Sequence, residues 1–148
     1  MPDFIAFAAG ENSMLEAGQG SPIKAGMPSA AVFALSTYAV SDFISHLGTA
    51  VTSAASIAEM SASWYVRASM VAPTPSGGNL QYGTGTWAST DTSGTLVKSV
   101  VLLSTPSLGT GASGIPYCAW NLQAGGTPVD MSQNNTTLTV TPLLTTGS

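Results

Sequence analysis

The most distinctive hydrophobic pattern in the chain is a run that starts after Gly94 and ends at Thr105, directly before Pro106. The run is rich in β-branched residues, is bounded by turn-forming residues and is too short for a convincing helix, so it predicts a β-strand. From Val100 to Leu103 every position is apolar, instead of every second one. That pattern is typical of a strand covered on both faces, as in the middle of a sandwich.

A second pattern, at residues 59–71, alternates from one residue to the next. It predicts a strand with Trp64 and Val66 on one face and Tyr65 and Arg67 on the other. Residues 38–60 are ambiguous, because their apolar spacings of three and four favour a short helix, whereas the Ser, Thr and Ala residues at the end favour an exposed loop. Further strands are predicted at residues 30–37, 80–87, 117–122 and 137–141.

The order of these patterns predicts an all-β protein. Short strands separated by turn signals at intervals of roughly 8–15 residues are typical of an antiparallel β-sandwich or jelly roll. The expected organisation is an extended N-terminal arm at residues 1–28, a β-sandwich domain at 29–144 and a polar tail at 145–148. Gly and Pro residues keep the arm from forming a long helix. The arm lies either on its own domain or across a neighbouring subunit, and we favour the neighbour.

Charged residues are unusually rare in this chain. They make up 7% of the 148 residues, with a formal net charge of −4, whereas about 25% is typical. Soluble monomers usually rely on charge to stay apart, so this composition favours a protein that lies against neighbours. A hydroxyl-rich extracellular or virion protein is the alternative. Lys24, Arg67 and Lys98 are too few and too scattered to neutralise phosphates, which argues against nucleic acid as a partner.

The sequence also argues against a disulfide, a cysteine-based metal site, a signal peptide and a membrane span. The single cysteine, Cys118, excludes an internal disulfide and a cysteine-based metal cluster. Asp3 stands where a signal peptide would carry a basic residue, and no apolar run reaches the ~18 residues of a membrane span. We therefore expect no membrane association. An extracellular location would need a route other than secretion, such as release inside a virion.

Three motifs suggest chemistry, but each has a simpler explanation. Residues 109–114 match a dinucleotide-binding glycine pattern, yet residues 115–117 cannot begin the helix that this mechanism requires, so a flexible loop is favoured. Asp91 opens an Asp-Thr-Ser-Gly sequence similar to the aspartic protease turn, but that chemistry needs two aspartates sharing a proton. His46 with Asp42 lacks an identifiable serine partner, and no spacing suits a metal. We expect no catalytic, cofactor-binding or metal-binding residues.

Aromatic residues and one charged pair are better explained by packing. Glu59 and Arg67 are expected to be structural, and Asn134 and Asn135 open two overlapping glycosylation sequons of the kind that Asn/Thr-rich turns produce by chance. Six aromatic residues could line a sugar-binding face, but each lies in or beside a predicted strand, so core packing is favoured. They are Trp64, Trp87, Trp120, Tyr65, Tyr82 and Tyr117.

The succession of these motifs resembles a group of small proteins of tailed bacteriophages, described as capsid cement, decoration or minor structural proteins. The resemblance covers most of the chain from about residue 11 and lies in five short segments. These are an opening turn at 11–15, a first core strand at 31–37, a Glu…Tyr-x-Arg segment at 59–67, a long central strand at 94–103 and a closing hairpin at 115–122.

The resemblance implies a sandwich or jelly-roll protein that binds the outside of a capsid as a small oligomer and has no enzymatic activity. We therefore expect a virion protein on the outer capsid surface that cements or decorates capsomer junctions. Its partners would be the major capsid protein and other copies of itself, as a homodimer or homotrimer. The candidate contact residues are Phe4, Ile5, Phe7, Phe43 and Ile44. One alternative is a receptor- or carbohydrate-binding module of a tail tip or fibre, and another is a small hydrolase that uses the single histidine.

Overall fold

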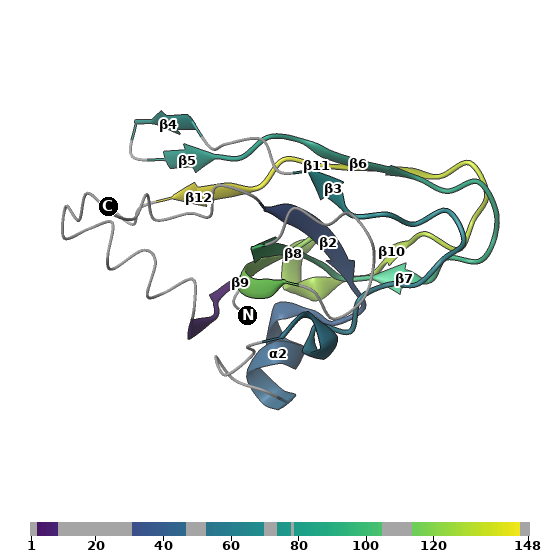
Figure 1. Ribbon diagram of the computed structural model, residues 1–148, viewed down its shortest axis with the longest axis horizontal. Helices are drawn as coiled ribbons and strands as arrows, with labels where there is room; N and C mark the ends of the chain where they lie inside the picture. The colour runs from purple at the N-terminus through teal and green to yellow at the C-terminus, as the bar shows by residue number, and fades with distance from the viewer. Residues whose placement is uncertain are drawn as a thin grey trace.

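The computed structural model describes residues 3–8, 31–46, 53–69, 74–77, 79–104 and 114–145. Over these residues the chain is all-β, as predicted, with antiparallel pairing throughout and one short α-helix (Figure 1). The strands are β1 (Phe4–Ala6), β2 (Val32–Ser36), β3 (Ala68–Ser69), β4 (Thr74–Ser76), β5 (Asn79–Gln81), β6 (Gly85–Ala88), β7 (Leu96–Val97), β8 (Ser99–Ser104), β9 (Ile115–Asn121), β10 (Val129–Asp130), β11 (Thr137–Val140) and β12 (Leu143–Thr145). The helix is α2 (Val40–His46), and the 3-10 turns are η1 (Ala54–Ser56) and η2 (Ala124–Gly126).

The centre of the molecule is a five-stranded sheet with the order β1-β9-β8-β2-β3. Strand β8 confirms the prediction made from the apolar run, although the run is divided at Lys98 into β7 and β8. The division has a structural reason, because β7 pairs with β10 while β8 pairs with β2 and β9. The Lys98 N–H donates to the Ser36 carbonyl at 2.9 Å, which joins the two strands to the sheet at this point.

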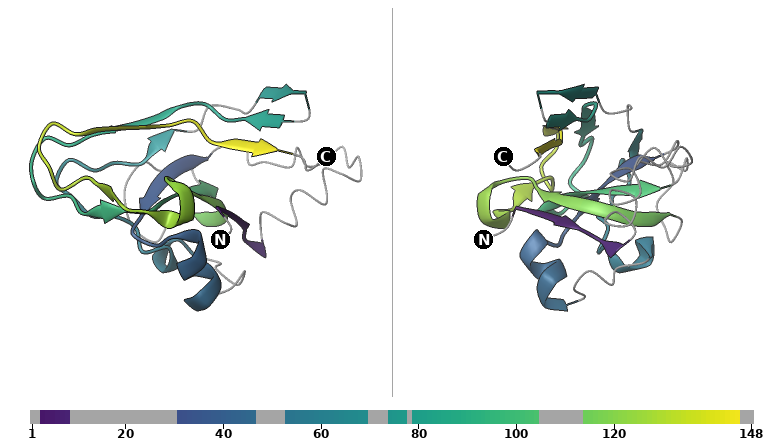
Figure 2. Two further views of the ribbon diagram at one scale, coloured as in Figure 1. Left: turned by 180° about the vertical axis from the view of Figure 1, so that it is seen from behind. Right: turned by 90° about the vertical axis from the view of Figure 1, so that its left-hand side faces the viewer.

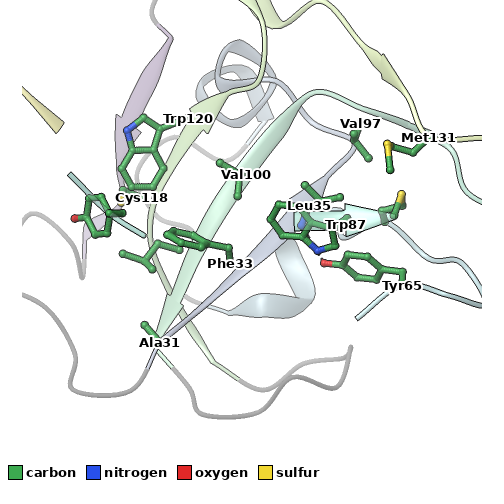
Figure 3. Close-up of a cluster of buried hydrophobic side chains, with 13 residues drawn as sticks. Ala31, Phe33, Leu35, Tyr65, Trp87, Val97, Val100, Cys118, Trp120 and Met131 are labelled. Carbon is green, nitrogen blue, oxygen red and sulfur yellow. Dashed lines mark hydrogen bonds between the residues drawn. The ribbon is translucent and has the colours of Figure 1, made fainter. Parts of the chain in front are cut away.

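Both faces of the central sheet are covered, which confirms the prediction for residues 100–103. Figures 1 and 2 show α2 on one side of this sheet. On the other side lies a long two-stranded layer that contains β6 and β11, which we call the ribbon. Toward the ribbon, the sheet packs Phe33, Leu35 and Val100 against residues that include Trp87 and Tyr65 (Figure 3). Toward α2, alternate residues of the same strands pack against the helix and η1. One of the two covers is therefore helical.

Four antiparallel strand pairs are nested one within another along the C-terminal half of the chain. The innermost is β8 with β9, followed by β7 with β10, β6 with β11 and β5 with β12. Residues 79–104 thus run antiparallel to residues 115–145 in one interrupted ladder. The architecture is an all-β antiparallel sandwich with a small helical layer. Nested pairing is compatible with the jelly-roll interpretation, which stays a prediction.

The strand predicted at residues 59–71 is largely wrong. Of its described residues, 59–69, only Glu59, in an isolated bridge with Ser36, and the two-residue strand β3 pair with another strand. The expected division of the faces is confirmed for residues 65–67, since Tyr65 and Arg67 are buried together while Val66 is 59% exposed. The ambiguous segment that follows β2 does form a helix, α2, whose first turn holds an aspartate. Residues 47–52 lie outside the described part.

The terminal segments differ from the predicted arm and tail. Residues 4–6 form the edge strand β1, which pairs with β9 through Phe4–Trp120, Ile5–Ala119 and Ala6–Cys118. The first part of the arm therefore lies on its own domain, and the preference for a neighbouring subunit is wrong for residues 3–8. Residues 9–30 lie outside the described part. Thr145, which was assigned to the tail, is the last residue of β12.

Candidate functional site

The five predicted contact residues do not gather on one exposed surface. Ile5, Phe7 and Phe43 belong to the core between the central sheet and α2, with Phe7 and Phe43 fully buried and their rings in edge-on contact at 5.2 Å. Strand alternation explains this, because Ile5 and Phe7 point to the same face of β1. Phe4 points to the other face and packs against Trp120, with the two ring centroids 5.5 Å apart. The exposure expected for Ile5, Phe7 and Phe43 is therefore wrong.

Ile44 is the one predicted contact residue that is well exposed, at 49% of its surface. It is the residue after Phe43 on α2, so it turns away from the core that Phe43 enters. Other large apolar side chains are also exposed on separate elements, and these are Val66, Leu96, Ile115 and Leu143. Exposed apolar residues are common when scattered singly, so they mark candidate contact points without defining a pocket.

The most elaborate polar arrangement in the described structure joins Glu59, Tyr65 and Arg67. The Arg67 guanidinium donates to both carboxylate oxygens of Glu59, through Nε and Nη2, each at 2.8 Å. The Tyr65 hydroxyl donates to Glu59 Oε1 at 2.9 Å and accepts the N–H of Leu35 at 2.9 Å. Arg67 is 1% exposed and Tyr65 5% exposed. We call these three residues the Glu59 cluster.

The electrostatics of the Glu59 cluster follow from burial and pairing. Burial, together with the neighbouring Glu59 carboxylate, raises the pKa of Tyr65 well above its ordinary value of 10.0. The hydrogen bond to Glu59 raises the pKa of the Arg67 guanidinium. A protonated phenol and a permanently charged arginine that both bond one carboxylate have little capacity for proton transfer at neutral pH. The cluster is suited to a structural role.

The position of the Glu59 cluster shows what that role is. Leu35 belongs to β2, and the Met60 N–H donates back to the Leu35 carbonyl at 2.9 Å. On the other side, the Trp87 indole N–H donates to the Val66 carbonyl at 2.9 Å. The segment that carries the cluster thus connects the central sheet to β6 in the ribbon layer. Glu59 and Arg67 were expected to be structural, and the structure shows that each is the other's partner.

Asp91 lies in an exposed turn and accepts hydrogen bonds from two serines. Its carboxylate accepts the Ser93 N–H at 2.7 Å and the hydroxyls of Ser93 and Ser63. The hydrogen bond from Ser63, followed by those from Ser93, lowers the pKa of Asp91 below its ordinary value. Two aspartates that share a proton would instead have one pKa raised. The geometry supports turn formation, which the sequence had favoured over protease chemistry.

Other motifs from the sequence contribute little to a chemical site. His46 is the last residue of α2, and its side chain lies outside the described part, as do residues 105–113 of the glycine pattern. Asn134 and Asn135 are exposed in the turn before β11. Trp87 and Trp120 are 3% and 9% exposed, as core packing predicts. Among the aromatics considered for sugar binding, Tyr65 and Tyr82 are also buried, and only Trp64 and Tyr117 retain partial exposure.

Charge and reactivity on the described surface are low. Lys98 pairs with Asp42 at 3.6 Å, and Arg67 pairs internally with Glu59. Cys118 is a free, fully buried thiol whose pKa is raised by burial. In the described ranges, no three His, Cys, Asp or Glu side chains gather closely enough to hold a metal ion. No helix of the described chain is both long and apolar enough to cross a membrane.

Comparisons with protein-family models, with curated proteins and with solved structures found no match to this chain.

Proposed function

We propose that this protein is a bacteriophage virion structural protein that binds the outer capsid surface and cements or decorates capsomer junctions. The observation that carries the proposal is the exterior of the sandwich. Of the described basic side chains, Lys98 pairs with Asp42 at the surface, and Arg67 is buried with Glu59. The rest of the described exterior carries hydroxyls, single exposed apolar side chains and a few carboxylates (Asp3, Asp91 and Asp130), a chemistry suited to broad contact with neighbouring proteins.

The mechanism of attachment would be the addition of many weak contacts. A capsid lattice presents identical sites at fixed spacings, and a small oligomer that bridges two of them gains avidity without any single strong contact. The partners would be the major capsid protein and other copies of this chain. Ile44, exposed on the helical layer, is the best contact candidate among the five predicted residues, with Phe4 partly accessible at the sheet edge.

The test is binding of purified protein to capsids of the encoding phage prepared without it. We expect saturable binding with many copies per particle, at one repeated position in a cryo-EM reconstruction. Ile44→Glu should reduce occupancy, because it places a charge in an apolar contact. Val66→Glu, an equally large change at an exposed position away from α2, is the matched control. A few copies per virion, or a position on the tail, would contradict the proposal.

A receptor- or carbohydrate-binding module of a tail tip or fibre is the second candidate, and one observation favours keeping it. Trp64 is partly exposed and adjoins Ser63, whose hydroxyl bonds to Asp91, so an aromatic ring lies near polar groups. Glycan-array binding that is lost in Trp64→Ala with folding intact would support this candidate. Trp87 is unsuitable for the same test, because truncating a buried tryptophan typically costs about 3–5 kcal/mol of stability.

A further inference from the structure

Within the described part of the chain, strand β11 is unpaired along its outer edge. It pairs with β6 on one side, and no other described strand pairs with it on the other. The Ser89 N–H donates to the Thr136 carbonyl at 2.8 Å, and the Tyr82 N–H donates to the Pro142 carbonyl at 3.0 Å. Because backbone groups of successive residues point to opposite sides of a strand, even-numbered residues from 136 to 142 face β6 and β5. The N–H and C=O groups of residues 137, 139 and 141 therefore face outward.

This edge lacks two of the features that normally prevent strands from joining, charge and proline within the strand. Natural edge strands are usually protected by charged side chains, by proline or by bulges. From Thr136 to Thr141 the chain contains no charged residue and no proline. Pro142 follows directly, and since it lacks an N–H it limits the open edge to the residues before it. Thr137, Thr139 and Thr141 are exposed on one face of the strand.

The sequence of the edge is symmetric about its centre. Residues 137–141 read Thr-Leu-Thr-Val-Thr, with the threonines on the exposed face and Leu138 and Val140 packed against the core. When two copies of this segment are placed antiparallel and centred on Thr139, Thr139 lies opposite Thr139 of the second copy. Threonines then face threonines, and Leu138 faces Val140. Threonine–threonine and apolar cross-strand pairs both stabilise antiparallel ladders.

We infer that the outer edge of β11 is a homodimer interface, in which residues 137–141 of two copies pair antiparallel about a two-fold axis through Thr139. The two ribbons become one four-stranded sheet with the order β6-β11-β11-β6. Such an interface uses the same surface on both subunits and closes at two copies. The low charge of the chain, −4 over 148 residues, leaves little repulsion to oppose it. This inference deepens the part of the proposed function in which copies associate.

The first experiment compares oligomeric state across variants by sedimentation velocity, from about 1 to about 100 μM, where weak specific interfaces dissociate. The unchanged protein is expected to form dimers. Thr139→Pro removes an outward N–H without disturbing the β6 side, and Thr139→Lys places like charges opposite each other; both are expected to be monomeric. Thr86→Lys is the matched control, because Thr86 is the exposed cross-strand partner of Thr139 on β6, and it should remain dimeric.

The second experiment tests the register by cross-linking. Directly opposed residues in an antiparallel pair have Cα atoms about 5.5 Å apart, a separation that suits a disulfide. Thr139→Cys should therefore oxidise to a covalent dimer at least about tenfold faster than Thr86→Cys, because the interface raises the effective concentration of the thiols. The buried thiol of Cys118 should not compete. Circular dichroism and thermal melting check that each variant is folded.

Specific results would overturn the inference. A monomer throughout the concentration range, a trimer, or a dimer that Thr139→Pro and Thr139→Lys leave intact would each do so. So would equal cross-linking rates at positions 139 and 86. These measurements use free protein, so a failure here is distinguishable from a failure of capsid binding, which is measured on particles.

Discussion

Replacing Glu59 by leucine should destabilise the protein far more than removing an exposed ion pair. Arg67 is 1% exposed and donates two 2.8 Å hydrogen bonds to the Glu59 carboxylate, which also accepts the Tyr65 hydroxyl. In Glu59→Leu the buried guanidinium loses the carboxylate that accepts these two hydrogen bonds. Breaking a buried pair in this way typically costs about 3–5 kcal/mol. Since domains are stable by only about 5–15 kcal/mol, the change removes a large part of the total.

This cost can be measured as a melting temperature and as a free energy of unfolding. At roughly 2–4 °C per kcal/mol for a chain of this size, Glu59→Leu should lower Tm by roughly 6–20 °C. Urea unfolding followed by tryptophan fluorescence gives the free energy directly. Lys98→Met is the control, because Lys98 pairs with Asp42 at 3.6 Å with both side chains about one-third exposed. Such a pair is worth at most about 1 kcal/mol.

The double variant Glu59→Leu/Arg67→Met isolates the cause. Replacing both members of a buried ion pair by apolar residues of similar size is often neutral or stabilising. The double variant should therefore recover most of the loss seen in Glu59→Leu. The reasoning about a buried charge is refuted if Glu59→Leu and Lys98→Met lose free energies of unfolding that agree within about 1 kcal/mol. It is also refuted if the loss in the double variant equals the sum of the losses in Glu59→Leu and Arg67→Met.

Three further predictions concern buried tyrosines, an exposed aspartate and a closely packed glycine. Tyr82→Phe should leave the free energy of unfolding in urea unchanged or raise it by up to about 1 kcal/mol, because the buried Tyr82 hydroxyl has no hydrogen-bond partner in the described structure. Tyr65→Phe loses two hydrogen bonds and should lower that free energy by about 1–3 kcal/mol. Asp91 has a lowered pKa, so the stability that it contributes is present above its ordinary value of 3.8 and is lost as the pH falls through the lower folded value. Between about pH 2 and pH 6, the Tm of Asp91→Asn should therefore depend less on pH than the Tm of the unchanged protein. The same pH dependence of Tm in both proteins would contradict this. Gly94→Ala would place a Cβ atom in steric conflict with the Met131 carbonyl oxygen and should cost about 1–3 kcal/mol by thermal melting.

The apolar runs predicted the central strands well for a simple physical reason. A strand that is apolar on successive residues must be covered twice, and β2 and β8 are buried on both faces. The rule does not identify the cover, which here is α2 on one face. At residues 65–67 alternation separated Tyr65 and Arg67 from Val66 as the structure does, but it does not identify which of the two faces is buried. A buried arginine is stable only through its partner, which lies eight residues earlier and carries no local signal.

Contact residues were harder to predict, because exposure depends on pairings between distant parts of the chain. Phe7 becomes buried when β1 pairs with β9, and nothing in the first residues of the sequence identifies that partner. The predicted strand at 137–141 formed, but its outer edge is open only because no other described strand takes that place. Propensity and alternation describe one segment at a time, whereas edges and interfaces belong to the assembled sheet.

The nested strand pairs have a consequence for the order in which the chain folds. Closing a loop costs conformational entropy that grows with the length of chain enclosed. Once β8 and β9 have met, each outer pair needs to enclose only a little more chain, so pairing can advance outward like a zipper. Strand β11 is completed late in that order, after its inner neighbours are in place. Its open edge is therefore presented by a nearly finished molecule, which favours association between folded copies over entanglement of unfolded ones.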